Sequence, residues 1–424
     1  MNLLEPHRLG SRNPETRATR RLLKCQVDRS SVIPGRPMSP VQRLRPARAG
    51  RHVPTAVIYC EAHFGGIDGK TANGLVRQSD TYRIVSVIDS EKAGLDAGEV
   101  LGDAHNGVTI CRDLAEAVAS AERLPDVFIF GIAPASGLLS VHERGVVLEA
   151  MSHGMDIVSG LHEFLGDDPV FIAAQAEHDV SIRDVRRPPD KKDLRLFDGS
   201  IAAVTCPRIA VLGTDCAIGK RTTATLLTRA LNERGINAVM IATGQTGLIQ
   251  GARYGVALDA MPSQFCAGEV EGAVVRAFAA ERPDVIIIEG QSALGHPAYL
   301  SSGFILRGSQ PQAVILQHAP ARKIRCDFES LPVPSPAVEI DLIETFAKTR
   351  VIGLTINHEG MTDADVTAAI IMYELELGIP ATDALTRPTD ELVEMVTRAF
   401  PGLSGAAQGE GPGYPAPLMS LEDH

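Results

Sequence analysis

The sequence lacks several features that would assign it to particular classes of protein. No apolar run reaches the roughly 18–20 residues needed to cross a bilayer. The N-terminal segment has no continuous apolar core of the kind found in secretory signals. Seven cysteines are scattered among 424 residues and never form a CxxC pair. This pattern excludes a zinc-finger spacing and a disulfide framework, so we expect a cytoplasmic protein without a bound metal.

Basic residues are scarce outside the first 51 residues. Residues 1–51 carry eleven Arg and one Lys against two Glu and one Asp, which gives this segment a net charge of +9. Because the whole chain has a net charge of −11, the remaining residues carry −20. The acidic remainder argues against a nucleic-acid partner, and we expect no membrane partner. Residues 1–51 are Arg- and Pro-rich without an apolar face, so we expect a disordered head. This segment is either a nucleic-acid-binding or targeting arm, or the result of a translation start assigned too far upstream. In the second case Met38 is one internal candidate for the true start.

A phosphate-binding loop is the most informative feature that is present. Residues 208–213 form a short apolar run that ends in glycine, and Gly219-Lys220 opens a strongly helical segment. In a strand–loop–helix arrangement of this kind, backbone N–H groups, the helix dipole and one lysine converge on an anion. We predict that the residues binding cofactor phosphates are Gly213, Thr214, Asp215, Gly219, Lys220, Arg221 and Thr222.

The loop departs from the usual P-loop spacing at two positions. Thr214 stands where a leading glycine is usual, and Arg221 stands where a Ser or Thr normally binds magnesium. Thr222 follows one place late. The loop is therefore suited to phosphates but departs from the pattern that holds Mg-ATP.

Strands alternate with helices in both halves, which predicts an α/β fold with two parallel-sheet domains. The glycines after the expected first strand, 55–61, do not spell G-x-G-x-x-G, so we expect a Rossmann-like scaffold in place of an NAD site. The second domain should resemble P-loop NTPases. The expected division is a Rossmann-like domain at 53–178, a linker at 179–206, a P-loop domain at 207–400 and a flexible tail at 401–424.

Polar residues follow the ends of the expected strands, where ligands bind in open parallel sheets. Glu289 ends an apolar strand at the Walker B position and is either a base or a structural carboxylate that binds loop N–H groups. His296 is either a general base or a surface-loop histidine. Residues expected to bind substrate stand at other strand ends, namely Gln245, Gln291, His318 and Arg322.

Three polar residues of the first half also qualify as site candidates. Lys70 and Thr71 stand at an expected helix start, where they could meet an anion. His162 follows an expected strand and is either a site residue or a packed imidazole.

Five segments of the second half resemble a bacterial and archaeal family, namely 213–223, 242–247, 288–297, 308–311 and 316–322. The family joins a P-loop domain of formerly unknown function to a Rossmann-like N-terminal domain, and the resemblance spans about residues 53–400. Some of its members are D-glutamate N-acetyltransferases. The resemblance implies transfer of acetyl from acetyl-CoA to the amine of a small-molecule amino acid, with Glu289 and His296 as candidate bases. We also expect a homo-oligomer.

Two other functions stay open on the sequence. The pattern Gly-Thr-Asp-x-x-x-Gly-Lys is also similar to the loop of dethiobiotin synthetase, which implies a Mg-ATP-dependent kinase or ligase with Thr222 and Glu289 at the metal. A non-catalytic nucleotide-binding regulator is the third reading. Arg221 at the magnesium position favours acetyl-CoA.

Overall fold

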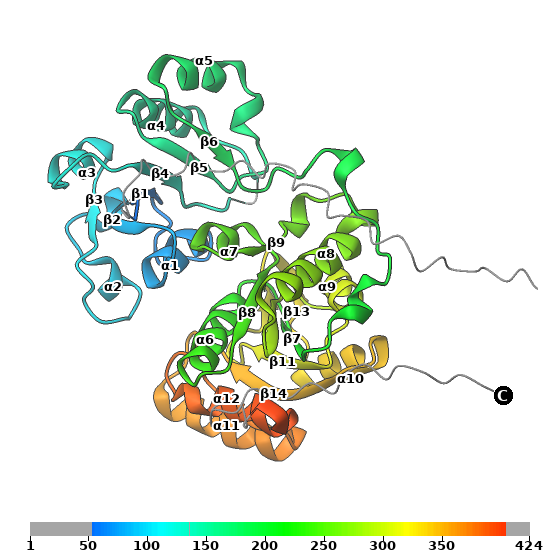
Figure 1. Ribbon diagram of the computed structural model, residues 1–424. Coiled ribbons are helices and arrows are strands. Elements are labelled where there is room, and N and C mark those ends of the chain that lie inside the picture. Colours follow the sequence, from blue (N-terminus) through cyan, green and yellow to red (C-terminus); the bar gives the residue numbers. More distant parts are fainter. Residues whose placement is uncertain (1–52, 135, 404–424) are drawn as a thin grey trace, which may run out of the picture. The chain divides into compact units, whose positions relative to one another are not determined.

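The computed structural model describes residues 53–134 and 136–403 (Figure 1). The predicted head at 1–51 lies outside these residues, and so does the predicted tail from residue 404 onward. Two larger sheets, of six and seven strands, form within the described residues, and all their strand pairs are parallel. The predicted α/β class with two parallel-sheet domains is confirmed.

The first sheet, blue to teal in Figure 1, has the strand order β3-β2-β1-β4-β5-β6 of dinucleotide-binding folds. Its strands are β1 Thr55–Tyr59, β2 Arg83–Ile88, β3 Thr109–Cys111, β4 Val127–Phe130, β5 Asp156–Ser159 and β6 Ile182–Asp184. The helices between them are α1 Lys70–Arg77, α2 Ala97–Val100, α3 Leu114–Ser120, α4 Val141–Ser152 and α5 Pro169–His178. Strand β6 pairs with β5 and so extends the first sheet into the range predicted as a linker.

The second sheet has the order β15-β14-β11-β7-β10-β8-β9. Its strands are β7 Arg208–Gly213, β8 Ala238–Ala242, β9 Tyr254–Gly255, β10 Val285–Glu289, β11 Ala313–His318, β14 Arg350–Ile356 and β15 Ala381–Thr382. Its helices are α6 Lys220–Glu233, α7 Gln245–Gln250, α8 Ser263–Glu281, α9 Ser301–Ser309, α10 Pro336–Phe346, α11 Asp363–Leu377 and α12 Thr389–Ala399. A separate antiparallel hairpin is made of β12 Ile324–Arg325 and β13 Phe328–Pro332.

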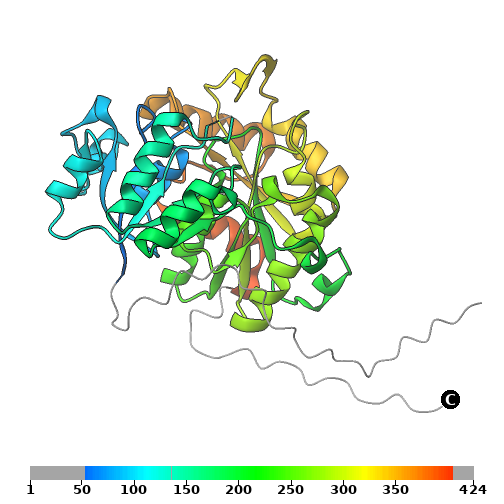
Figure 2. The ribbon, with the colours of Figure 1, turned by 90° about the horizontal axis from the view of Figure 1, so that it is seen from above.

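Strand β7 shows why the second sheet needs helices on both faces (Figure 2). Its side chains alternate, so Ile209 and Val211 join the core cluster that includes residues of α6 and α12. Ala210 and Leu212 join the opposite cluster, with residues of α8 and α9. All four are at most 1% exposed. A strand buried on both faces reads as a continuous apolar run, which explains why this run was recognisable in the sequence.

Among the described residues, no helix has the length and apolar character needed to span a bilayer. The six cysteines in this part of the chain are free thiols.

Candidate functional site

The loop between β7 and α6 is shaped to present backbone N–H groups. Ala217 has φ +48° and Gly219 has φ +100°, so left-handed residues alternate with ordinary ones along the loop. Among the described residues, no carbonyl or side chain accepts a hydrogen bond from the N–H groups of 216–219. Successive N–H groups in such a conformation form an anion-binding concavity, and the start of α6 adds the positive end of its dipole. The loop therefore leaves these N–H groups available to an anion, and phosphate binding here stays a prediction.

Arg322 fixes the orientation of this loop from outside. Its Nη1 donates to the carbonyl of Cys216 at 2.8 Å and to Asp215 Oδ2 at 3.2 Å, and its Nη2 donates to the carbonyl of Ala217 at 3.3 Å. Nη2 also donates to Glu359 Oε2 at 2.6 Å. Because the loop carbonyls are turned toward Arg322, their neighbouring N–H groups are turned elsewhere. The residue predicted to bind a substrate carboxylate instead has both terminal nitrogens engaged with the protein.

Lys220 lies folded back on its own loop. Its Nζ donates to the carbonyl of Asp215, and the residue is 5% exposed. Burial lowers the pKa of this ammonium group, an effect that the nearby Cys216 and Asp215 oppose. A side chain on Gly213 would come within 3.0 Å of Lys220 Cδ, so glycine at this position makes room for the lysine stem. An anion on the loop would supply the countercharge that the buried ammonium needs.

Two amide side chains stand beside the loop. Gln317 Oε1 accepts hydrogen bonds from Thr223 Oγ1 at 2.6 Å and Thr355 Oγ1 at 2.5 Å, which fixes the orientation of its amide. A Cβ on Gly219 would lie 3.6 Å from Gln317 Nε2 and 3.8 Å from Asn357 Nδ2. These amide donors were not among the predicted site residues, although both follow the polar pattern at strand ends.

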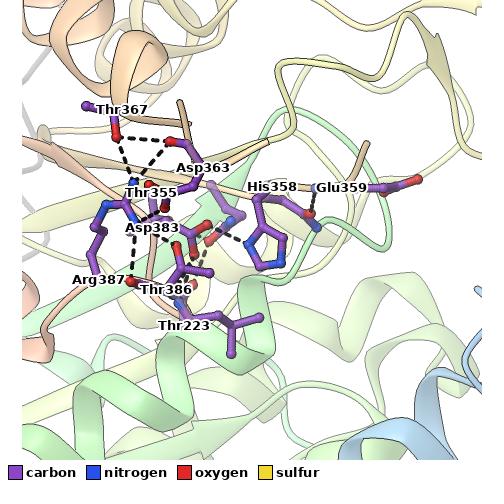
Figure 3. Close-up of polar contacts among 12 residues, drawn as sticks. Thr223, Thr355, His358, Glu359, Asp363, Thr367, Asp383, Thr386 and Arg387 are labelled. Carbon is purple, nitrogen blue, oxygen red and sulfur yellow. Dashed lines mark hydrogen bonds and ion pairs between the residues drawn. The ribbon is translucent and has the colours of Figure 1, made fainter. Parts of the chain in front are cut away.

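Farther along the same edge, the polar side chains bind each other. His358 Nδ1 and Asp383 Oδ2 are 2.6 Å apart, and Arg387 Nη1 donates to Asp363 Oδ1 at 2.6 Å (Figure 3). These internal bonds close the part of the edge near β14 and β15, so the candidate site centres on β7 and its neighbours.

His318 supports the loop from β11. Its Nδ1 lies 2.8 Å from Thr214 Oγ1, and its ring meets Tyr373 edge-on. Burial, with a smaller contribution from Lys323, lowers the pKa of His318 from 6.5 to about 4. The imidazole is therefore neutral and orients Thr214, which is itself fully buried.

His296 lies close to Asp215 and Cys216 of the loop. One ligand-type atom each from Asp215, Cys216 and His296 lies within 4.8 Å of the others. Asp215 Oδ1 and His296 Nε2 are buried atoms without a hydrogen-bond partner. His296 Nδ1 accepts the N–H of Ala298 at 3.2 Å, so the neutral ring carries its proton on Nε2.

The position of this proton determines which ligand could bind between Asp215, Cys216 and His296. A proton on His296 Nε2 makes that atom a donor and not a metal ligand, and Asp215 Oδ2 is already paired with Arg322. The cluster offers one donor and one acceptor, which fits a small polar group such as a bridging water better than a cation. Burial, together with Arg325, lowers the pKa of His296, which keeps the ring neutral.

Glu289 lies at the end of β10, where its carboxylate contacts the turn after β8. Oε2 accepts the N–H of Thr243 at 2.9 Å, and the Glu289 carbonyl accepts Thr243 Oγ1 at 3.0 Å. Gln291 Nε2 donates to the carbonyl of Thr243 at 2.8 Å. Burial raises the pKa of Glu289, and the nearby Arg221 opposes this effect. Glu289 and Gln291 are thus placed around the turn that leads into α7.

Arg221 is directed away from the loop toward the first domain. Its Nη1 donates to Gln250 Oε1 at 2.5 Å, and Gln250 Nε2 donates to the carbonyls of Gly74 and Gln78 at 2.8 and 2.9 Å. A Cβ on Gly74 would lie 2.5 Å from Arg221 Nη1, so a side chain at this position would force the guanidinium to shift. Arg221 therefore links α6 to α1 through Gln250 of α7. It had been predicted to bind cofactor phosphates.

The two remaining predicted residues are placed on helices. Thr222 is half-buried in the first turn of α6. Gln245 begins α7 and is buried, and a side chain on Gly160 would come within 2.9 Å of its Cγ. Gln245 was expected at a strand end, and the structure also begins the short helix α7 at this residue.

Family models match both domains. Residues 195–393 match a P-loop domain described as a domain of unknown function, DUF1611, and residues 90–188 match the Rossmann-like domain described as its N-terminal part. A crystal structure of a DUF1611 family protein from Anabaena variabilis has a TM-score of 0.75 at 32% identity, covering 81% of this chain and 99% of that one.

Two curated relatives are named D-glutamate N-acetyltransferase. The protein from Pseudoalteromonas sp is 30% identical over 297 residues, which cover 68% of this chain and 87% of the relative. The protein from Tritonibacter scottomollicae is 31% identical over 299 residues, which cover 66% of this chain and 83% of the relative.

Proposed function

Because this chain belongs to the DUF1611 family, we propose that it is an N-acetyltransferase that moves acetyl from acetyl-CoA to the amine of an amino acid such as D-glutamate. The acceptor is taken from the names of the two curated relatives. In this proposal the loop between β7 and α6 holds phosphates of CoA, which is bound and released without phosphoryl transfer.

One structural observation supports the proposal independently of the names of the two relatives. The loop combines N–H donors at 216–219 with the buried ammonium of Lys220, yet the residue after the lysine is Arg221, bound to Gln250. A P-loop that hydrolyses or transfers a phosphoryl group needs a hydroxyl at that position for magnesium. A loop with the anion cradle and without that hydroxyl suits a phosphorylated carrier whose phosphates do not react.

Chemically, the reaction needs a base to remove a proton from the ammonium group and donors to stabilise the oxyanion. Glu289 and His296 stay predicted bases. Glu289 already accepts the Thr243 N–H, and the proton on His296 Nε2 leaves that nitrogen a donor.

Binding measurements on the full chain test the proposal. Isothermal titration with acetyl-CoA should give saturable binding that falls about 10–100-fold in Lys220→Ala, because a charge-assisted contact to phosphate is worth ~1.5–3 kcal/mol. Lys192→Ala, whose side chain is exposed, serves as the matched control and should bind normally. Thiol release on addition of D-glutamate, with the acetylated product identified by mass, completes the assignment. Binding of Mg-ATP with none of acetyl-CoA would overturn it in favour of a kinase or ligase.

A further inference from the structure

Beyond the loop, the carboxyl ends of strands from both sheets meet at one junction. Thr71 Oγ1 at the start of α1 lies 2.9 Å from Thr246 Oγ1 of α7. Ile249 of α7 is fully buried within the core of the first domain. In parallel sheets the carboxyl ends are where ligands bind, so a junction of two such edges is a place for a ligand that spans both domains.

His162 stands at this junction, shortly after β5, in a fixed and accessible position. Its side chain is 46% exposed. Its backbone N–H donates to the carbonyl of Gly137 at 3.2 Å, and Gly137 has φ +67°. A Cβ on Gly137 would lie 2.9 Å from His162 Cδ2, so the ring lies directly over this glycine. The contact limits the ring's movement and leaves one side open.

Charged groups around His162 suit an imidazole that exchanges protons. Asp259 Oδ2 lies 3.9 Å from His162 Nε2 and accepts from Arg186 Nη2 at 2.7 Å. Arg186 is 7% exposed and also donates to the carbonyl of Gly160, so it holds the carboxylate in place. Burial lowers the pKa of His162, helped by Arg186 and Lys70 and opposed by Asp259. The ring is therefore neutral near pH 7, with a carboxylate ready to stabilise its cation.

Lys70 belongs to the same junction. It is exposed at the start of α1, one residue before Thr71, whose Oγ1 lies 2.9 Å from Thr246 Oγ1. An exposed ammonium at this place is suited to the carboxylate of a small substrate.

CoA holds its reacting group far from its phosphates. Its thioester is separated from its pyrophosphate by the whole pantetheine arm. If the phosphates occupy the loop, the thioester lies well away from Lys220 and its immediate neighbours Asp215 and His296. The exposed side chains of His162 and Lys70 at the junction are then suited to hold an acceptor that meets it.

We propose that the acceptor amino acid binds at this junction, with a carboxylate on Lys70 and its amine beside His162, which acts as the base for acetyl transfer. This inference rests on the proposed function and names the residues that would bind its second substrate. Both residues were site candidates on the sequence, Lys70 at an expected helix start and His162 after an expected strand.

The proton balance of the reaction is complete with one imidazole. His162 takes a proton from the substrate ammonium and passes it to solvent, which leaves a neutral amine. The amine nitrogen attacks the thioester carbonyl carbon, and the carbon–sulfur bond then breaks with its electron pair on sulfur. The second proton of the nitrogen passes through His162 to the thiolate, so the products are the N-acetyl amino acid and CoA thiol.

Two variants of the full chain test the proposal with acetyl-CoA and D-glutamate as substrates. Lys70→Met should raise the KM for D-glutamate at least about tenfold with kcat less affected, because a charged contact to carboxylate is lost. His162→Gln should lower kcat about 10²–10⁴-fold, and activity should recover partly at alkaline pH, where solvent deprotonates the amine. His142→Gln, on the exposed face of α4, and Lys192→Met serve as controls.

The outcomes distinguish failure of the junction site from failure of the proposed acetyltransferase function. Unchanged affinity for acetyl-CoA in both variants, with the losses above and unaltered melting temperatures, supports the junction site. Wild-type kcat and an unchanged pH profile in His162→Gln, or an unchanged KM in Lys70→Met, overturn the junction site alone. A wild-type chain that binds no acetyl-CoA overturns the proposed function together with it.

Discussion

Replacing His318 should remove a specific part of the protein's sensitivity to acid. The folded chain holds this residue with a pKa of about 4, against 6.5 for an ordinary histidine, because burial disfavours the imidazolium. As pH falls below 6.5, the unfolded chain takes up a proton at His318 while the folded chain does not, so the free energy of unfolding decreases. Between about pH 7.5 and pH 5 this linkage costs about 2 kcal/mol, and about 3 kcal/mol once both states are protonated.

Urea unfolding of the wild type and of His318→Gln at the two pH values isolates this effect. The glutamine side chain stays neutral and can still accept the hydroxyl of Thr214, so the variant should lose about 2 kcal/mol less than the wild type on acidification. His142→Gln, at an exposed position, is the control and should follow the wild type. An equal loss in the wild type and in His318→Gln would show that this imidazole is protonated as easily in the folded chain, and the reasoning would be refuted.

Three further substitutions probe the framework around the loop. Gly74→Ala should destabilise by ~1–3 kcal/mol in thermal unfolding, because its methyl group would displace the half-buried Arg221 from its hydrogen bond to Gln250, whereas Gly145→Ala in the exposed part of α4 should be neutral or stabilising. Equal melting temperatures for these two variants would contradict the tight approach. Leu227→Ala, at a fully buried position of α6, should cost ~2–5 kcal/mol in urea unfolding, and a smaller loss would indicate that the core around α6 collapses into the space. Arg322→Lys should weaken acetyl-CoA binding about tenfold by titration without any contact to the ligand, because one ammonium cannot hold two loop carbonyls and two carboxylates at once. Wild-type affinity would mean that the loop keeps its shape without this residue.

The sequence was sufficient for the fold because its signals were local and repeated. Strands buried on both faces appear as apolar runs, and the run 208–213 followed by Gly219-Lys220 located the loop with its flanking strand and helix. Helix α7 was missed because its six residues contain glycine and are too few to be stable alone. It is held by packing, with Ile249 in the core of the first domain, and such a contact has no signature in neighbouring residues.

The candidate site was only partly predictable for a related reason. The strand ends were located correctly, but the partner of each side chain depends on residues far away in sequence. Arg322 binds carbonyls 105 and 106 positions away, and Arg221 binds Gln250 across 29 positions. Residue type alone marks these arginines as anion ligands, whereas their long-range partners turn them into supports for the loop and the domain junction.

The chain of contacts from Arg221 through Gln250 to Gly74 has a consequence for recombining domains. Many two-domain proteins exchange their halves freely because few specific contacts join them. Here a first domain from another source that carried a side chain at the position of Gly74 would force the guanidinium of Arg221 to move. Keeping Gly74 and Arg221 together is therefore a condition for recombining the two halves without disturbing this contact.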